Sequence, residues 1–418
     1  MRLKTVLNRC LRFKGFVYRK AEFSDQTIMV RIEAREGSSP MCSECGRAGA
    51  VYDHERNLRA FEHIPIWGFP VFFIYRMRRV DCRLCGRVIV ERVPWATGKH
   101  HTTDVYRCFL ANWGKVLAWQ EVARRFRTCW QTVFRSVQYV VQFGLQHRRL
   151  DDVQALGIDE LAWQKGHEYV TAVYQIDPDH QRLLWIGQER RERTLRGFFS
   201  AMELESPGFC QRIRVVCSDM WRAYRNVIRE RIGHAVHVLD RFHIMQHFGK
   251  ALDQIRAEEA RRLHSRGQQP LLKRTRWCLL KRPEHLSDPQ RARLGDLLRL
   301  NLRTTRAYLL KEQFQLFWQY RSAFWAGRFL ETWCRHVMRS RLRPLKRIAQ
   351  MLRSHREEIL NWFRLKKAFS SAIVEASNNK FKLTLRKAFG FRSFDVMQVA
   401  VLHQLGDLPE PHFAHEFW

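Results

Sequence analysis

The sequence of 418 residues lacks any long uninterrupted hydrophobic stretch, and it has few acidic residues for its size. A membrane-spanning helix needs about 18 or more consecutive apolar residues, and no segment reaches that length. The first residues, MRLKTVLNRCLRFKGF, also lack the apolar core and small-residue cleavage site of a secretory signal peptide. These absences argue against a membrane or secreted protein and predict a cytoplasmic one. Because cytosolic thiols stay reduced, the 11 cysteines are not expected to form a disulfide framework.

The charge is strongly unbalanced toward basic residues. Lys and Arg number 74 against 41 Asp and Glu, a formal charge of +33, and hydrophobic residues make up 45%, which predicts a globular chain of several compact units. Basic and acidic residues number 27 and 12 in residues 1–150, 12 and 14 in residues 151–240, and 35 and 15 in residues 241–418. This distribution favours nucleic acid as the partner, held by two basic segments around a middle segment that binds divalent cations. Solvated charged faces would give the same counts.

Two Cys-x-x-Cys pairs predict a metal site. A glycine follows each pair, so that the backbone can turn tightly and bring both thiolates to one ion. Four thiolates form a closed tetrahedral site for structural Zn²⁺, and the alternative is a pair of redox-active or buried dithiols. The segment VFFIYRMRRVDC between the pairs predicts one strand. The predicted zinc ligands are Cys42, Cys45, Cys82 and Cys85, and the predicted packing residues are Cys10, Cys108, Cys129, Cys210, Cys217, Cys278 and Cys334.

Residues 118–141, AWQEVARRFRTCWQTVFRSVQYVV, predict two short helices joined by a turn, as in a helix-turn-helix. Thr128 followed by Gln131 fits a capping box that would start the second helix at Cys129. An ordinary helical hairpin has the same pattern. The apolar faces would be formed by Val122, Ala123, Phe126, Val133, Phe134 and Val137. The side chains presented to a DNA major groove would be Trp130, Gln131 and Arg135.

From residue 153, short apolar runs predict the order strand, strand, strand, helix, strand, helix, strand. The first three strands should be antiparallel and the later ones parallel, which gives a mixed α/β sheet. Asp159 lies within the first strand, and Asp219 follows the fourth. A buried aspartate is costly unless it is paired or ligates a metal, and divalent cations such as Mg²⁺ would relieve the repulsion between two of them. Either aspartate alone could simply end or cap its element.

The segment VEASNNKFKLTLRKAFGF, residues 374–391, supplies a third carboxylate. If it is helical, one face carries Glu375, Asn379, Lys382 and Arg386. Glu375 would complete a metal cage with Asp159 and Asp219, and the other three side chains would bind along a phosphate backbone. Two metal ions in such a cage would activate a water or hydroxyl and stabilise the leaving oxygen, which is the chemistry of phosphodiester cleavage and strand transfer.

The residues between Asp219 and Glu375 predict an all-helical insertion, because apolar residues repeat at helical spacing with few glycines. Its tryptophans are expected to pack helices together rather than to stack on bases; they include Trp318, Trp325 and Trp333. Asp240 and His243 are expected to form a hydrogen-bonded structural pair, with assistance to the acidic site as the alternative.

These motifs resemble the ISL3-type insertion-sequence transposases, a family of the DDE group with a ribonuclease-H-like core. The resemblance covers roughly residues 40–400 and rests on the four cysteines, the two-helix pattern, and the segments GIDE, SDMWRAY, DRFH and EASNNKFKLTLRKAFGFRSF. It implies that Asp159, Asp219 and Glu375 are catalytic acids that bind Mg²⁺ or Mn²⁺, and that Lys382 lies near the substrate strand. The family's small glycine before the third acid is replaced here by Val374.

The resemblance implies a DNA transposase that binds the terminal inverted repeats of its insertion sequence and catalyses metal-dependent cleavage and strand transfer of double-stranded DNA. It would be nucleoid-associated and a homo-oligomer, with a dimer expected because joining two ends needs two active sites. The alternative is a non-catalytic DNA-binding regulator, which would not require the three acids. The expected fold is a multidomain α/β chain with a zinc-ribbon-like DNA-recognition module (1–100), a helix-turn-helix (101–150), the first part of the ribonuclease-H-like core (151–241), the all-helical insertion (242–367), and the core's carboxy-terminal helix and tail (368–418).

Overall fold

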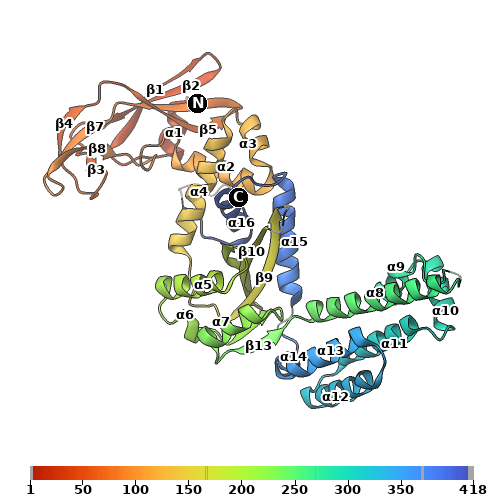
Figure 1. The fold of residues 1–418 in the computed structure, drawn as a ribbon. Coiled ribbons are helices and arrows are strands. Elements are labelled where there is room, and N and C mark those ends of the chain that lie inside the picture. The colour runs from red at the N-terminus through yellow and green to blue at the C-terminus, as the bar shows by residue number, and fades with distance from the viewer. Residues whose placement is uncertain (1–2, 165, 167, 269, 369–370, 413–418) are drawn as a thin grey trace. The chain divides into compact units, whose positions relative to one another are not determined.

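The computed structural model describes residues 3–164, 166, 168–268, 270–368 and 371–412 (Figure 1). The chain forms two compact units, Met1–Arg148 with Leu383–Trp418, and Arg149–Lys382. The sequence assigned 368–418 to the core, whereas the division falls inside helix α15 (Ser371–Lys387). Within the described ranges, no helix combines the length and the apolar character needed to cross a membrane.

The amino-terminal part of the first unit is built from two four-stranded sheets that follow helix α1 (Leu3–Cys10). One sheet has the order β1 (Phe16–Ser24), β2 (Thr27–Ala34), β6 (Phe69–Tyr75) and β5 (Arg59–Ile66). The other has the order β3 (Met41–Cys42), β8 (Arg87–Arg92), β7 (Arg78–Cys82) and β4 (Ala50–His54).

The single strand predicted for VFFIYRMRRVDC is wrong, because this segment forms β6 and β7 in different sheets. Tyr75 and Met77 are buried in the core of the first sheet, whereas Arg78 is buried in the second. There its guanidinium donates to both Glu91 and the carbonyl of Ser38, at 2.7 Å to each. The chain leaves one sheet after Tyr75 and enters the other at Arg78, so Arg76 and Met77 connect the two strands.

Three helices complete this part of the chain: α2 (Asp104–Val116), α3 (Trp119–Arg125) and α4 (Trp130–His147). The predicted capping box is wrong, since Cys129 is the N-cap of α4 and the cap makes no side-chain hydrogen bond. Arg127 adopts a positive φ of 51° in the turn, which shifts the helix start by one residue. Helix α16 (Phe394–Leu405) packs against α4 from the carboxy-terminal segment. The predicted apolar faces do pack together, with Val122, Val133 and Val137 all fully buried.

The second unit contains the predicted mixed sheet, with the order β11-β10-β9-β12-β13. Strands β9 (Ala155–Gln164), β10 (Glu168–Asp177) and β11 (His180–Gln188) are antiparallel neighbours. Strands β12 (Val215–Ser218) and β13 (Val236–Leu239) run parallel to β9. Helices α5 (Glu192–Glu205), α6 (Phe209–Arg212) and α7 (Arg222–Ile232) connect the later strands. The predicted element order is therefore confirmed, with α6 added.

The regular elements that the structure describes between 242 and 367 are all helices, joined by turns and loops, as predicted (Figure 1). Its elements are α8 (Arg241–Ser265), α9 (Arg276–Leu280), η1 (Pro283–His285), α10 (Asp288–Leu298), α11 (Arg303–Gln315), η2 (Leu316–Gln319), α12 (Ala323–Arg339), α13 (Arg343–Ser354) and α14 (Arg356–Arg364). Trp318 and Trp333 are buried as expected. The expectation for Trp325 is wrong, because its side chain is 55% exposed on α12 and lies under Arg328.

Most cysteines outside the two pairs are packing residues, as predicted. Cys108, Cys217, Cys278 and Cys334 are buried and Cys210 is partly buried. Cys129 is an exception because it lies exposed in the turn before α4. The side chain of Cys10 lies outside the described part of the structure.

Candidate functional site

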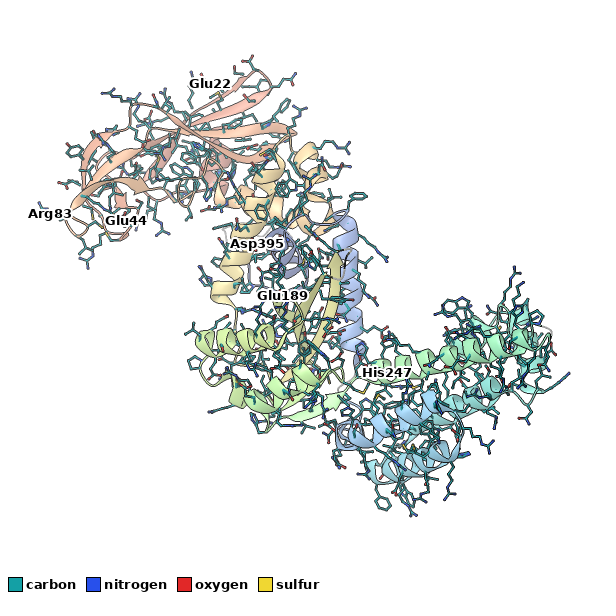
Figure 2. The ribbon with its side chains drawn as sticks, in the orientation of Figure 1. Glu22, Glu44, Arg83, Glu189, His247 and Asp395 are labelled. Atoms are coloured by element: carbon teal, nitrogen blue, oxygen red, sulfur yellow. The ribbon has the colours of Figure 1, made fainter. Side chains whose placement is uncertain are left out.

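The four cysteines of the two Cys-x-x-Cys pairs converge on one point. Their Sγ atoms all lie within 4.8 Å of one another. Both pairs form the same turn, in which the glycine after the second cysteine has a positive φ and donates its N–H to the carbonyl of the first cysteine. Glu44 and Arg83, labelled in Figure 2, lie between the cysteines of each pair and mark the two turns. The contacting ligands are Cys42, Cys45, Cys82 and Cys85.

The electrostatics of this cluster favour a cation at its centre. The backbone N–H of Cys45 lowers the pKa of the Cys42 thiol to about 7. The contact with Cys82 raises the pKa of the Cys85 thiol to about 12, because a second thiolate beside the first is repelled. A divalent cation removes that repulsion, so the donor set and its spacing fit a tetrahedral zinc site.

Three aspartates lie at one edge of the mixed sheet of the second unit. Strand β12 pairs Cys217 with Gly157 of β9 and Ser218 with Leu239 of β13. Continuing these registers places Asp219 beside Asp159 on one side and beside Asp240 on the other. The three strands are parallel, so Asp159 within β9 and the two aspartates that directly follow β12 and β13 lie toward the same edge of the sheet.

Asp159 is the most enclosed of these carboxylates. Its Oδ1 accepts a hydrogen bond from the N–H of Glu160 at 2.7 Å, and its Oδ2 accepts one from the side-chain amide of Asn378. Burial is the largest influence on this group and raises the pKa of Asp159 above its ordinary value. A carboxylate in this setting is stabilised by any positive charge brought beside it.

Asn378 was not predicted, although it connects helix α15 to the sheet. It is buried together with Val374 and Phe381 on the face of α15 that covers β9 (Figure 1). Its amide oxygen accepts a hydrogen bond from the hydroxyl of Tyr174 on β10 at 3.0 Å. The spacing of Val374, Asn378 and Phe381 was the available signal, because an amide on the apolar face of a helix must find a buried partner.

Helix α15 approaches the sheet closely because β9 has a glycine beneath it. A Cβ added to Gly157 would lie 2.5 Å from Cγ2 of Val374. The valine that replaces the family's small residue is therefore a packing residue against this glycine. The close approach allows the short amide of Asn378 to reach Asp159 two residues along the strand.

Asp219 and Asp240 both accept hydrogen bonds at the start of helices. Asp219 accepts from the N–H of Trp221 at 2.9 Å, ahead of α7. Asp240 is the N-cap of α8 and accepts from the N–H of Phe242 at 2.6 Å, while its Oδ2 lies 3.1 Å from Nδ1 of His243. The expected pairing of Asp240 with His243 is confirmed as an ion pair.

His243 is exposed to the electrostatic field of all three aspartates. Burial lowers its pKa, but the hydrogen bond to Asp240 and the charges of Asp240, Asp159 and Asp219 outweigh burial and raise the pKa to about 9. His247, labelled in Figure 2, lies one turn further along α8, where burial lowers its pKa. The acidic edge of the sheet therefore carries a compensating imidazolium.

Glu375 lies about a quarter turn around α15 from the buried face and is exposed, as are the other members of the predicted polar stripe, Asn379, Lys382 and Arg386. It lines a hollow of about 1,130 Å³ together with Asp240. Among the described residues, Asp159, Asp219 and Glu375 do not form a group whose ligating atoms all lie within 4.8 Å. The structure thus places Asp159 and Asp219 at neighbouring positions of adjacent strands and does not gather the three carboxylates into one closed cage.

The same hollow is rich in cationic side chains. Arg241 and Lys250 belong to α8, and Trp277 contributes an aromatic ring that is 55% exposed. Basic side chains beside the carboxylates would attract a polyanionic strand and offset the repulsion between its phosphates and the acidic residues. The basic residues that line the hollow are Arg241, Lys250, Arg276, Arg282 and Lys311.

In the first unit, α4 exposes the three side chains predicted to face DNA. Trp130 is 39% exposed, and Gln131 and Arg135 are also exposed. The opposite face of α4 packs on α2 and α3, so the exposed face is available to a ligand.

Two family models match this chain. Residues 156–401 match the DDE transposase model of the ISL3 family, and residues 38–85 match the zinc finger of transposases IS204/IS1001/IS1096/IS1165. The first match covers more than half of the chain. The chain belongs to the ISL3 family of transposases. The resemblance inferred from the sequence is thereby confirmed.

The similar proteins with curated names are also transposases of insertion sequence elements. The chain is 30% identical over 354 residues to the transposase for insertion sequence element IS1001 of Bordetella parapertussis. The aligned region covers 84% of this chain and 85% of the relative. It is 29% identical over 399 residues to the transposase for IS1557 of Mycobacterium tuberculosis, with 88% and 86% covered. The Drosophila P element transposase strand transfer complex aligns with a TM-score of 0.40 at 10% identity, over 77% of this chain and 93% of that one, and this likeness carries no weight in the assignment.

Proposed function

We propose that this transposase binds the terminal inverted repeats of its insertion sequence and cleaves and joins DNA at divalent metal ions held by Asp159, Asp219 and Glu375. The observation that carries the proposal is the position of Asp159 and Asp219 on adjacent parallel strands, under the helix that bears Glu375. We also propose that the sheet is ribonuclease-H-like, since three antiparallel strands are followed by two parallel ones.

The donor set fits Mg²⁺ or Mn²⁺, which prefer carboxylate oxygens. Bound ions of this kind supply an activated water or hydroxyl and a charge that stabilises the leaving oxygen. Asn378 and the N–H of Glu160 fix the carboxylate of Asp159, and the N–H of Trp221 fixes that of Asp219. The exposed Lys382 would contact a phosphate of the substrate strand.

The four cysteines would hold one structural Zn²⁺, which would stabilise the module that contacts DNA. Helix α4 would then read base edges in the major groove through Trp130, Gln131 and Arg135. Asn379 and Arg386 would extend the phosphate contacts along α15. Joining two transposon ends to target DNA requires two active sites, so the functional form would be a dimer or a larger homo-oligomer.

A strand-cleavage assay on the DNA that flanks the gene of this transposase tests the proposal. The wild-type protein should cleave in the presence of Mg²⁺, and Asp159→Ala, Asp219→Ala and Glu375→Ala should each abolish cleavage while retaining end binding. Asp240→Asn is the matched control, because it removes a negative charge at the same edge of the sheet while keeping the size of the side chain that caps α8. This variant should still cleave DNA.

Activity in any one of the three alanine variants would remove that residue from the site. An active Asp219→Ala together with an inactive Asp240→Asn would reassign the second acid to Asp240. Specific end binding without cleavage by the wild-type protein would support the alternative, a DNA-binding regulator.

A further inference from the structure

A second hollow lies wholly within the unit formed by Met1–Arg148 and Leu383–Trp418, and the proposed function gives it no role. Its volume is about 890 Å³, which falls in the range of about 300–1,000 Å³ that is usual for small-molecule sites. Its walls are α3, the first residue of α4, the end of α15, α16 and the loop between α15 and α16. The aromatic residues that line it are Trp119, Trp130, Phe389 and Phe391, and the arginines are Arg124 and Arg392.

Phe389 is held at the rim in an unfavourable backbone conformation. It has a φ of 55°, and its side chain is 96% exposed. Its N–H donates to the carbonyl of Arg386 at 3.0 Å as α15 ends. A left-handed conformation costs a residue with a Cβ about 1–2 kcal/mol, and exposure of an aromatic ring gains nothing for the fold. A strained, exposed ring at the mouth of a hollow therefore indicates a binding role.

His403 contributes a neutral side chain to the wall of the hollow. It lies in the wall of the hollow on α16 and is 8% exposed. Within the described residues, its Nε2 is buried without a hydrogen-bond partner. Burial lowers the pKa of His403 to about 3, so the ring is neutral and offers one N–H and one lone pair. Nε2 is closed off from solvent, so His403 borders the hollow through its other atoms and contributes an uncharged part of the wall.

The aromatic wall is fixed before any ligand arrives. The ring of Trp119 lies 6.2 Å from that of Trp130 and 6.3 Å from that of Phe391, between centroids. Trp130 in turn stacks on Phe134 at 5.5 Å with an interplanar angle of 11°. A preformed surface of this kind loses little conformational entropy on binding.

The cations differ in their availability. Lys387 donates to the carbonyls of Gly114 and Lys115 at 3.0 and 2.9 Å, and so caps the end of α2. Arg124 pairs with Glu121 and its side chain is 78% exposed, and Arg392 lies exposed at the loop. The hollow therefore combines flat apolar rings with guanidinium groups near its opening.

We propose that this hollow binds an unpaired nucleotide of the DNA engaged by α4. Phe389 and Trp119 would stack on the base, and the arginines would contact its phosphates. Duplex DNA keeps its bases stacked inside the helix, so only an unpaired base can enter. The inference rests on the proposed DNA-binding function and adds a subsite outside the acidic edge of the sheet.

The test uses the full-length chain and fluorescence anisotropy with an oligothymidine strand and with a duplex of the same length. Phe389→Ala should weaken strand binding by about 5- to 150-fold, the equivalent of the loss of one base stack, and should leave duplex binding unchanged. Phe389→Tyr should bind like the wild type. Phe389→Gly should bind as weakly as Phe389→Ala but unfold at a higher temperature, since glycine tolerates the positive φ. Phe324→Ala, which removes a ring that is 65% exposed on α12, is the matched control.

A single 2-aminopurine in the strand gives a direct signal, because its fluorescence should be quenched on binding to the wild type and to a lesser degree on binding to Phe389→Ala. Unchanged strand affinity in Phe389→Ala overturns the proposal. An equal loss on strand and duplex also overturns it, because the hollow would then contact only the backbone. A change in oligomeric mass with intact strand binding would assign the surface to a second copy of the chain. A wild-type chain that binds neither strand nor duplex would overturn the proposed function as well.

Discussion

Asn378→Leu tests how helix α15 is fixed to the catalytic sheet. Asn378 is 7% exposed and bridges two buried groups, the carboxylate of Asp159 and the hydroxyl of Tyr174. Leucine branches at Cγ as asparagine does, although it is larger, and it can make neither hydrogen bond. Each buried group left without a partner costs about 1–3 kcal/mol, so the free energy of local opening should fall by about 2–6 kcal/mol in total.

Hydrogen–deuterium exchange of the β10 amides in the full-length chain measures this quantity, since local opening sets their exchange rate. The double variant Asn378→Leu/Tyr174→Phe removes the stranded hydroxyl and should recover about 1–3 kcal/mol. Asn379→Leu is the matched control, because Asn379 is exposed on the same helix and its loss should change stability by less than about 0.5 kcal/mol.

Asn378→Leu should also lower Mg²⁺-dependent cleavage by about 10- to 100-fold, as expected when a residue that orients a metal ligand is removed. Exchange of the β10 amides at the wild-type rate would contradict the bridging role of Asn378. A double variant as unstable as the single one would show that the hydroxyl of Tyr174 finds water or another partner.

Three further predictions concern other parts of the chain. Cys82→Ser should release one zinc ion per chain, measured by elemental analysis, and unfold the amino-terminal sheets, because a closed thiolate site contributes directly to folding; folded wild-type protein without zinc would refute the assignment. Gln131→Ala and Arg135→Ala should each lose about 1–3 kcal/mol of discrimination between terminal-repeat and scrambled DNA. Lys382→Ala should instead lower the slope of log affinity against log salt concentration by about one unit. Unchanged discrimination would show that α3 and α4 are an ordinary helical hairpin that does not read base edges. Burial lowers the pKa of His237 from 6.5 to about 4, so the full stabilisation from its neutral form is present above pH 6.5. The free energy of unfolding should fall by up to about 3 kcal/mol as the pH drops through about 4. A His237→Gln variant with the same pH dependence would exclude this histidine as the cause.

The sequence alone determined the features that depend on short spacings. The two Cys-x-x-Cys turns were predictable because a glycine after each pair permits the positive φ that aims two sulfur atoms at one point. The order of strands around Asp159 and Asp219 was predictable because runs of apolar residues of strand length alternate with helical segments. The exposed stripe from Glu375 to Arg386 followed from helical periodicity. Each of these patterns is set by the sterics of neighbouring residues in the chain.

Only the tertiary structure decided which distant residues meet. Asn378 reaches Asp159 across 219 positions, and Lys387 caps α2 across 273. Arg78 at the start of β7 finds its buried partner, Glu91, across 13 positions. Local propensity carries no information about such pairs, because the free energy that selects them comes from burying polar groups with their partners and from close packing. For the same reason the aromatic hollow beside α4 could not be found in the sequence, since its walls come from two segments that join only when the chain is folded.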